Sequence, residues 1–154
     1  MKQLTLSLFG HRRIRDKDRV AKDLKNYLNL KVVGNKSKIL IGCHGEFDAE
    51  AMEVCMQLKQ EGFNIDICIV YASLRTASRH IKEYPYFFQN AEAIMYDVEN
   101  EYFKKRIVVS NQRMIDESDE IIVYYDSRNG KFGGVHSVMK YAEKENKKVT
   151  NIFK

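Results

Sequence analysis

Two glycine turns, each followed at once by a helical pattern, are the stretches of this sequence best suited to binding an anion. Gly42 and Gly45 follow the apolar run at 39–41, and Gly133 and Gly134 precede the last helical pattern. Glycine lets the backbone approach a ligand closely, and the free N–H groups at a helix N-terminus attract negative charge. The turns therefore predict a phosphate site, with an ordinary strand-to-helix turn that holds no ligand as the alternative.

Polar side chains beside these turns provide candidate ligand contacts. Asp48 can contact a sugar hydroxyl or cap its own helix. Cys43 lies in the turn itself, where it either faces a ligand or is a structural residue. His136 and Ser137 fall in the first turn of the last helix, and Ser137 can donate to a phosphate oxygen. Plain capping or surface roles are the alternatives for both residues.

Basic residues follow two of the predicted strands. Gly10, His11 and Arg12 come directly after the first apolar run, and Arg75 follows the third. An arginine can grip a phosphate group through two parallel N–H bonds. Arg12 is the preferred candidate, because Gly10 permits close approach and His11 adds a second donor. A solvated loop charge is the alternative for each arginine.

Several kinds of catalytic and metal chemistry find no support. The sequence has neither the P-loop nor the dinucleotide GxGxxG pattern, and it has no HExxH motif. The histidines are scattered, so no metal and no cofactor are expected. Glu46, Asp48 and Asp126 are acidic candidates for glycosidic chemistry, but spacing pairs no two of them. Catalytic residues therefore stay unknown, with Glu46 and Asp48 as the candidates to test.

Positive charge is concentrated at the start of the chain. The net charge is +5, and residues 1–40 carry eleven Lys and Arg against three Asp and Glu. Residues 41–154 carry fifteen against eighteen. A basic helix face of this kind is typical either of a solvated surface or of one that binds nucleic acid or phosphorylated ligands.

The composition is typical of a globular protein in a reducing compartment. Hydrophobic residues make up 44% of the chain, and no apolar run approaches the roughly 20 residues that span a bilayer. The start of the sequence lacks the apolar region of a signal peptide. None of the three cysteines belongs to a CxxC pair, and Cys55 and Cys68 are expected to be buried. We expect a soluble, cytoplasmic protein without a membrane partner.

Strand and helix patterns alternate along the whole chain. Short apolar runs predict strands, and apolar residues at helical spacing predict the helices between them. Strands are expected at 4–9, 38–43, 65–71, 93–96, 120–126 and 148–153, and helices at 16–30, 47–61, 103–118 and from 134 onward. This alternation predicts an α/β fold, a Rossmann-like open and mainly parallel sheet with helices on both faces, in a single domain of residues 1–154.

Ligands of such sheets bind at the carboxyl ends of the strands. This rule brings the loops at 10–12, 42–45, 72–75 and 126–136 to one edge. The segment 72–103 is the least regular part of the sequence and holds the only proline, Pro85, within an aromatic stretch. It is expected to cover that edge, to close the core or to contact a second subunit, so the formation of a homo-oligomer stays open.

The order of these motifs resembles that of the SLOG superfamily of Rossmann-like domains, and most of all its YpsA-like branch of small bacterial and phage proteins. The matching pieces span nearly the whole chain: Phe9-Gly10-His11-Arg12, Gly42-x-x-Gly45-x-x-Asp48-x-x-Ala51, Asn111-x-x-Met114-Ile115-Asp116-x-Ser118-Asp119, Gly133-Gly134 and Tyr141-Ala142. The resemblance implies a nucleotide or nucleotide-derived ligand, and it adds Asn111 to the candidate contacts.

Members of the superfamily differ in what they do. The LOG-type enzymes cleave N-glycosidic bonds in nucleoside monophosphates, and others resemble the DNA-processing Smf family or act as sensor modules. The glutamate and arginine of LOG-type enzymes are replaced here by Val109 and Ser110, and no threonine follows Gly133 and Gly134 as in their PGGxGT loop. These departures favour a nucleotide-binding sensor or accessory module. An N-glycosidic hydrolase or deoxyribosyltransferase is the alternative, and a nucleic-acid-binding accessory protein is the second alternative.

Overall fold

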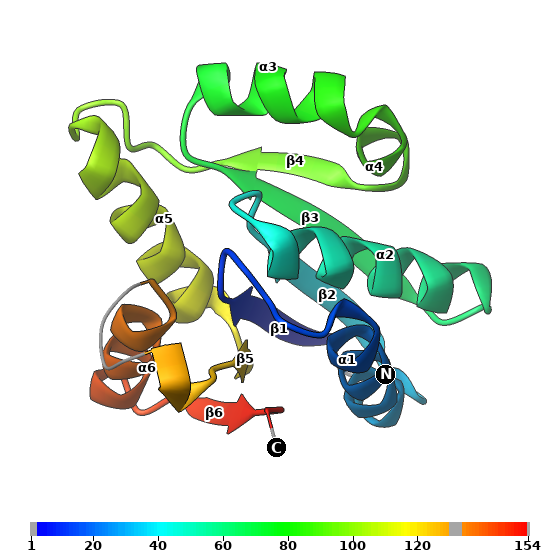
Figure 1. The fold of residues 1–154 in the computed structure, drawn as a ribbon. Helices are drawn as coiled ribbons and strands as arrows, with labels where there is room; N and C mark the ends of the chain where they lie inside the picture. The colour runs from blue at the N-terminus through cyan, green and yellow to red at the C-terminus, as the bar shows by residue number, and fades with distance from the viewer. Residues whose placement is uncertain (1–2, 130–133, 154) are drawn as a thin grey trace.

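A computed structural model describes residues 3–129 and 134–153, which form one sheet with helices on both of its faces (Figure 1). The strands are β1 (Gln3–Gly10), β2 (Lys36–Ile41), β3 (Ile65–Tyr71), β4 (Glu92–Met95), β5 (Glu120–Tyr124) and β6 (Lys148–Asn151). The helices are α1 (Lys17–Val32), α2 (Glu46–Gln60), α3 (Leu74–Glu83), α4 (Pro85–Asn90), α5 (Phe103–Glu117) and α6 (Gly134–Lys144), with a short 3-10 turn, η1, at Ser127–Asn129.

The six strands lie in the order β4-β3-β2-β1-β5-β6, and every neighbouring pair is parallel. The predicted Rossmann-like α/β fold is therefore confirmed. The chain starts in the middle of the sheet, moves outward from β1 to β4, and then crosses back to β5 on the other side of β1. This reversal creates a topological switch point at the carboxyl ends of β1 and β5.

Side chains that point alternately to the two faces of β1 contribute to two separate layers of the core. Leu6 and Leu8 point to the face that α1 and α2 cover, where they join a cluster that includes Leu24. Phe9 points to the opposite face and packs in a cluster with Met114 of α5 and Val135 of α6. Because successive residues of a strand face opposite sides, one strand supplies both layers.

The segment 72–103 is more regular than its sequence pattern predicts. The sequence pattern marks no helix in this segment, but the structure has two, α3 and α4, in the connection between β3 and β4. The hydroxyl of Ser73 caps α3 by accepting from the Thr76 N–H at 3.1 Å, and Pro85 is the first residue of α4, where its missing N–H costs nothing. Only Thr76 of α3 is buried, so the helix lacks a long apolar stripe.

Two further predictions concern burial. Cys55 and Cys68 are both fully buried, as expected of small apolar residues. Within residues 3–129 and 134–153, no helix has the length and apolar character that are needed to cross a membrane.

A buried carboxylate joins α1 to the last two strands. The side chain of Glu120 is 4% exposed, and its oxygens accept from the hydroxyls of Tyr27 at 2.5 Å and Thr150 at 2.7 Å. Lys31 forms an ion pair with it at 2.9 Å. Burial alone would raise the pKa of Glu120, but the hydrogen bonds from Tyr27, Lys31 and Thr150 outweigh burial and lower it. Glu120 therefore stabilises the fold as the ionised form.

We expect Glu120→Gln to lower the free energy of unfolding by about 1–2 kcal/mol, because glutamine keeps the shape but loses the charge that faces Lys31. Urea unfolding at neutral pH measures this change. Glu61→Gln is the matched control, since Glu61 pairs with Lys25 at 2.6 Å while its side chain is 49% exposed. That change should cost about 0.5 kcal/mol or less. Equal losses in the two variants would show that burial of Glu120 adds nothing.

Candidate functional site

A cavity of about 320 Å³ lies beside the switch point, lined by residues at the carboxyl end of β1, by the turn after β2 and by the start of α6, which follows β5. We call it the switch-point cavity. Its walls come from the loop after β1, the turn after β2, the middle of α5 and the start of α6. The lining residues are Phe9, Gly10, His11, Arg12, Gly42, His44, Asp48, Ile107, Asn111, Gly134, Val135 and Val138. Seven of the predicted ligand-binding residues, which are far apart in the sequence, therefore border one cavity.

The loop after β1 is held against the start of α2. The backbone carbonyl of Arg12 accepts from the Glu46 N–H at 2.8 Å, and the Glu46 carboxylate accepts from the Ile14 N–H at 2.9 Å. Gly10 packs directly on the ring of Phe47, where a Cβ atom would lie only 2.1 Å from Cγ. The position of Arg12 at the cavity mouth thus depends on a glycine and on backbone contacts.

His11 links the two loops that diverge at the switch point. Its Nε2 accepts from the backbone N–H of Asp126 at 2.8 Å, so the ring is neutral and carries its proton on Nδ1. Burial lowers the pKa of His11, although the nearby Asp126 opposes this shift. The two Asp126 carboxylate oxygens accept from Arg128, Oδ1 from Nε at 2.9 Å and Oδ2 from Nη2 at 2.6 Å. These hydrogen bonds lower the pKa of Asp126 to about 2. Asp126 is therefore a structural anion and lies outside the cavity lining.

The turn between β2 and α2 is built on Gly45. This residue has φ +126°, and a Cβ atom there would lie 2.6 Å from the Arg12 Cα, so only glycine fits without strain. Gly45 is the N-cap residue of α2 and provides no side-chain cap. Asp48 does not cap the helix in the usual way: its Oδ2 reaches back to accept from the His44 N–H at 2.8 Å.

Asp48 is the one side chain that lines both the switch-point cavity and a second cavity beside it. Burial raises the pKa of Asp48 to about 6, and the His44 N–H and the Arg12 charge oppose this shift only in part. His44 is affected in the opposite sense, since burial and the Arg12 charge lower its pKa to about 4. A cavity carboxylate whose burial is only partly offset by hydrogen bonds and opposite charges is a common feature of functional sites.

The pKa shift of Asp48 makes a testable stability prediction. Because its pKa rises from 3.8 to about 6 on folding, ionisation of Asp48 costs stability as the pH increases through that interval. Asp48→Asn, which keeps an oxygen acceptor for the His44 N–H, should therefore stabilise the protein by about 2 kcal/mol at pH 7 and by nearly nothing at pH 4. Urea unfolding at both pH values checks this difference.

The control for this experiment is Asp66→Asn, which changes an exposed aspartate on β3. That variant should show no gain at either pH. A gain of Asp48→Asn that is equal at both pH values would contradict the assigned shift, because a pH-independent effect cannot come from ionisation.

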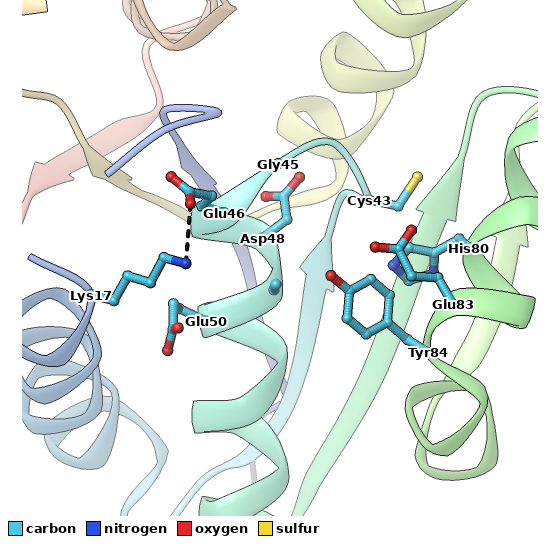
Figure 2. Close-up of a pocket in the computed structure, with 10 residues that line it drawn as sticks. Lys17, Cys43, Gly45, Glu46, Asp48, Glu50, His80, Glu83 and Tyr84 are labelled. Carbon is cyan, nitrogen blue, oxygen red and sulfur yellow. Dashed lines mark ion pairs between the residues drawn. The ribbon is translucent and has the colours of Figure 1, made fainter. Parts of the chain in front are cut away.

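The second cavity, of about 360 Å³, lies between α2 and α3, and we call it the α2–α3 cavity. Figure 2 shows Cys43, His80 and Tyr84 on one side of the start of α2, and Lys17 on the other. Its lining includes the carboxylates of Glu46, Asp48, Glu50 and Glu83. Lys17 is the only lysine in that lining, and it pairs with Glu46 at 3.1 Å (Figure 2). Although this cavity is slightly larger, its carboxylates disfavour an anionic ligand.

Cys43 belongs to the α2–α3 cavity. Burial and the nearby Asp48 raise the pKa of its thiol to about 12, so the residue is a protonated thiol at neutral pH and a poor nucleophile. Gly45 and Glu46 line the same cavity. The Glu46 carboxylate is already held by the Ile14 N–H and by Lys17, which lower its pKa. Of the two candidate catalytic carboxylates, only Asp48 is left to act on a ligand in the switch-point cavity.

The remaining predicted residues lie elsewhere. Arg75 is exposed in the first turn of α3 and lines neither cavity. His136 packs against Tyr125, with 6.2 Å between ring centroids, instead of lining the switch-point cavity. Ser137 is exposed and borders a shallower groove between α5 and α6. Gly133 lies outside the described residues.

The sequence interpretation missed the apolar wall of the switch-point cavity. Ile107 of α5, Val135 and Val138 of α6 face this space. Helical spacing marks all three as apolar-face residues, which sequence reasoning assigns to the core. His44 was also missed, although its place between two turn glycines is a signal. Within residues 3–129 and 134–153, no group of three or more His, Cys, Asp or Glu is placed to hold a metal ion.

No protein-family model matches the chain, and a search of curated proteins finds no match either.

Proposed function

We propose that the protein binds a nucleotide or a nucleotide-derived ligand in the switch-point cavity and acts as a sensor or accessory module. The observation that carries this proposal is the convergence of Gly10, Gly42 and Gly134 from three distant segments on one cavity at the carboxyl edge of a parallel sheet. Ligands of open α/β sheets bind at this place, and glycines let the backbone come close to them.

The chemistry of the walls supports a ligand with both an anionic and an apolar part. The amino end of α6 at Gly134 and the guanidinium of Arg12 are expected to hold a phosphate group. Asp48 and Asn111 offer an acceptor and an amide for sugar hydroxyls or ring nitrogens. The apolar side chains opposite them are suited to the flat face of a base.

The experiment is a thermal-unfolding screen against nucleotides, nucleosides and sugar phosphates. A ligand at about 100 times its dissociation constant adds about 2.7 kcal/mol of stability. For a chain of this size, that gain raises Tm by roughly 5–10 °C. We expect phosphorylated nucleosides to stabilise the protein more than nucleosides or inorganic phosphate do. No shift with any nucleotide at millimolar concentration would contradict the proposal.

An N-glycosidic hydrolase or deoxyribosyltransferase is the second candidate, and the raised pKa of Asp48 favours it. A carboxyl group whose pKa is about 6 can exchange a proton with a leaving base near neutral pH. Release of free base from a nucleotide panel, followed by chromatography, tests this activity. The enzyme hypothesis requires Asp48→Asn to abolish release while nucleotide binding persists. Unchanged nucleotides after prolonged incubation would leave binding as the function.

A further inference from the structure

We infer that a second surface of this protein, on the loop after β1 and the first turn of α1, binds single-stranded nucleic acid. This surface, which we call the arginine strip, consists of Arg13, Arg15, Lys17 and Arg19 together with Arg12, which also lines the switch-point cavity. All five side chains are exposed and lie within eight positions, interrupted by Ile14, Asp16 and Asp18. A cluster of cations on one short segment is the electrostatic mark of a phosphate-binding surface.

The strip is held in a fixed shape. Ile14, in its middle, is only 8% exposed and donates its N–H to the Glu46 carboxylate at 2.9 Å. The carbonyl of Arg12 accepts from the Glu46 N–H, and Asp16 caps α1 by accepting from the Arg19 N–H at 3.1 Å. Since the backbone is anchored between the arginines, binding a strand requires ordering of their side chains alone.

Three of the cations form no close ion pair, although the charges of Arg12 and Arg15 act at longer range on Asp48 and Asp126. Lys17 pairs with Glu46 at 3.1 Å, and Arg19 lies 3.8 Å from Asp23. Arg12, Arg13 and Arg15 form no ion pair with any acid of residues 3–129 and 134–153. Unpaired arginines on an anchored loop are free to contact phosphate oxygens.

Aromatic rings lie beside the strip. A cavity of about 240 Å³ is lined by Arg15, Arg19 and Arg128, by the rings of Tyr124 and Phe153, and by two acids, Asp16 and Asp23. The two aromatic rings meet edge to face with centroids 5.3 Å apart, and the Arg128 guanidinium lies 5.5 Å from the Phe153 centroid. Tyr124 is only 8% exposed and Phe153 is half-buried, so an unpaired base can stack on the Phe153 side of this wall while its backbone follows the arginines.

These features favour a single strand over a duplex. Bases of a duplex are stacked in its interior, so a protein usually reads them with a helix or ribbon inserted in a groove. Here α1 packs against the sheet through Val20, Leu24 and Leu28, and the strip lies on its supporting loop. A single strand presents phosphates and free base faces together, which matches arginines next to an aromatic wall.

Fluorescence anisotropy with labelled oligothymidylate measures the inferred binding as a function of salt. Three phosphate contacts give a slope of about −2 in log K against log salt, which corresponds to roughly 20-fold weaker binding between 50 and 200 mM salt. The double variant Arg13→Gln, Arg15→Gln should reduce that slope by about 1.4. The control is the double variant Lys140→Gln, Lys144→Gln, which removes the same charge from exposed residues of α6 on the opposite face of the sheet. It should leave the slope unchanged.

Several results would overturn this inference. Among them are the absence of oligothymidylate binding at low salt and equal slopes for the strip and control variants. Tighter binding of a duplex of the same length, or of anionic phospholipid vesicles, would assign the strip to a different partner. Neither Arg13 nor Arg15 lines the switch-point cavity, so both variants should keep their response to nucleotides. Conversely, a protein that binds no nucleotide can still bind the strand, and the two proposals fail separately.

Discussion

Replacing Gly10 with alanine should destabilise the protein by about 3 kcal/mol or more. A Cβ atom at this position would lie 2.1 to 2.5 Å from three ring atoms of Phe47, far inside van der Waals contact. The ring of Phe47 is fully buried in the layer between α2 and the sheet, so it has no room to move away. The expected decrease in Tm is roughly 6–12 °C for a chain of this size.

Two control variants isolate the cause of this loss. Gly134→Ala makes the same chemical change at a position where a Cβ atom meets nothing within 4 Å in the part of the chain that the structure describes, and it should not lower stability. Gly10→Ala should also cost at least about 1 kcal/mol less when Phe47 is leucine, because the shorter side chain vacates the overlapping space. Strict additivity of the two substitutions would show that the Gly10 to Phe47 contact is not the source of the loss.

Gly134→Asp should weaken nucleotide binding about 100-fold without unfolding the protein. The added carboxylate would stand at the first residue of α6, on the wall of the switch-point cavity, and would repel a phosphate group. An aspartate in the first turn of a helix is itself favourable, and no atom of residues 3–129 and 134–153 outside α6 would lie within 4 Å of its Cβ. Calorimetric titration with the best nucleotide of the thermal screen measures the effect.

Gly134→Asn is the matched control for charge, since asparagine has the same size as aspartate without its charge. It should weaken binding far less than aspartate does. If both variants bind like the original protein, the amino end of α6 is not part of the ligand site. If both lose binding equally, the side-chain volume blocks the cavity and the ligand carries no phosphate near α6.

Local patterns in the sequence predict the strands and four of the helices well. The run Ile65–Tyr71 matches β3 at both ends, because its continuous apolar residues and the flanking polar ones mark the limits of a strand buried on both faces. The end of α2 is similarly marked by Gly62, whose φ of +99° suits a helix C-terminus. Three strands end two residues before their predicted ends: β2 stops at Ile41, β5 at Tyr124 and β6 at Asn151. At β2 and β5 the chain turns there to form the site.

The sequence does not reveal what depends on long-range contacts. The position of β1 between β2 and β5 arises from the crossover after β4, and nothing local to β4 or β5 encodes it. The helices α3 and α4 escaped prediction because they bury few residues, with Thr76 and Phe87 as the buried ones. In α3 the apolar residues Leu74, Ala77 and Ile81 do recur at helical spacing, but polar and charged residues separate them in a short segment.

In the candidate site, too, local sequence features could be predicted, whereas features set by long-range contacts could not. Glycines at strand ends are visible in the sequence, so Gly10, Gly42 and Gly134 could be predicted as lining residues. Their neighbours could not be assigned to a side of the turn, and Cys43 and Gly45 instead border the α2–α3 cavity. Which residues of a short turn face which cavity depends on backbone angles such as the φ of +126° at Gly45.

The central claim is that a nucleotide binds in the switch-point cavity, and NMR titration of the amide signals tests it most directly. Glycine amides resolve well, and the chain has both site and control glycines. We expect a nucleotide to shift the signals of Gly10, Gly42 and Gly134, which line the cavity, and to leave those of Gly34 and Gly62 unchanged. No shifts at millimolar nucleotide, or shifts confined to Gly34 and Gly62, would contradict the claim.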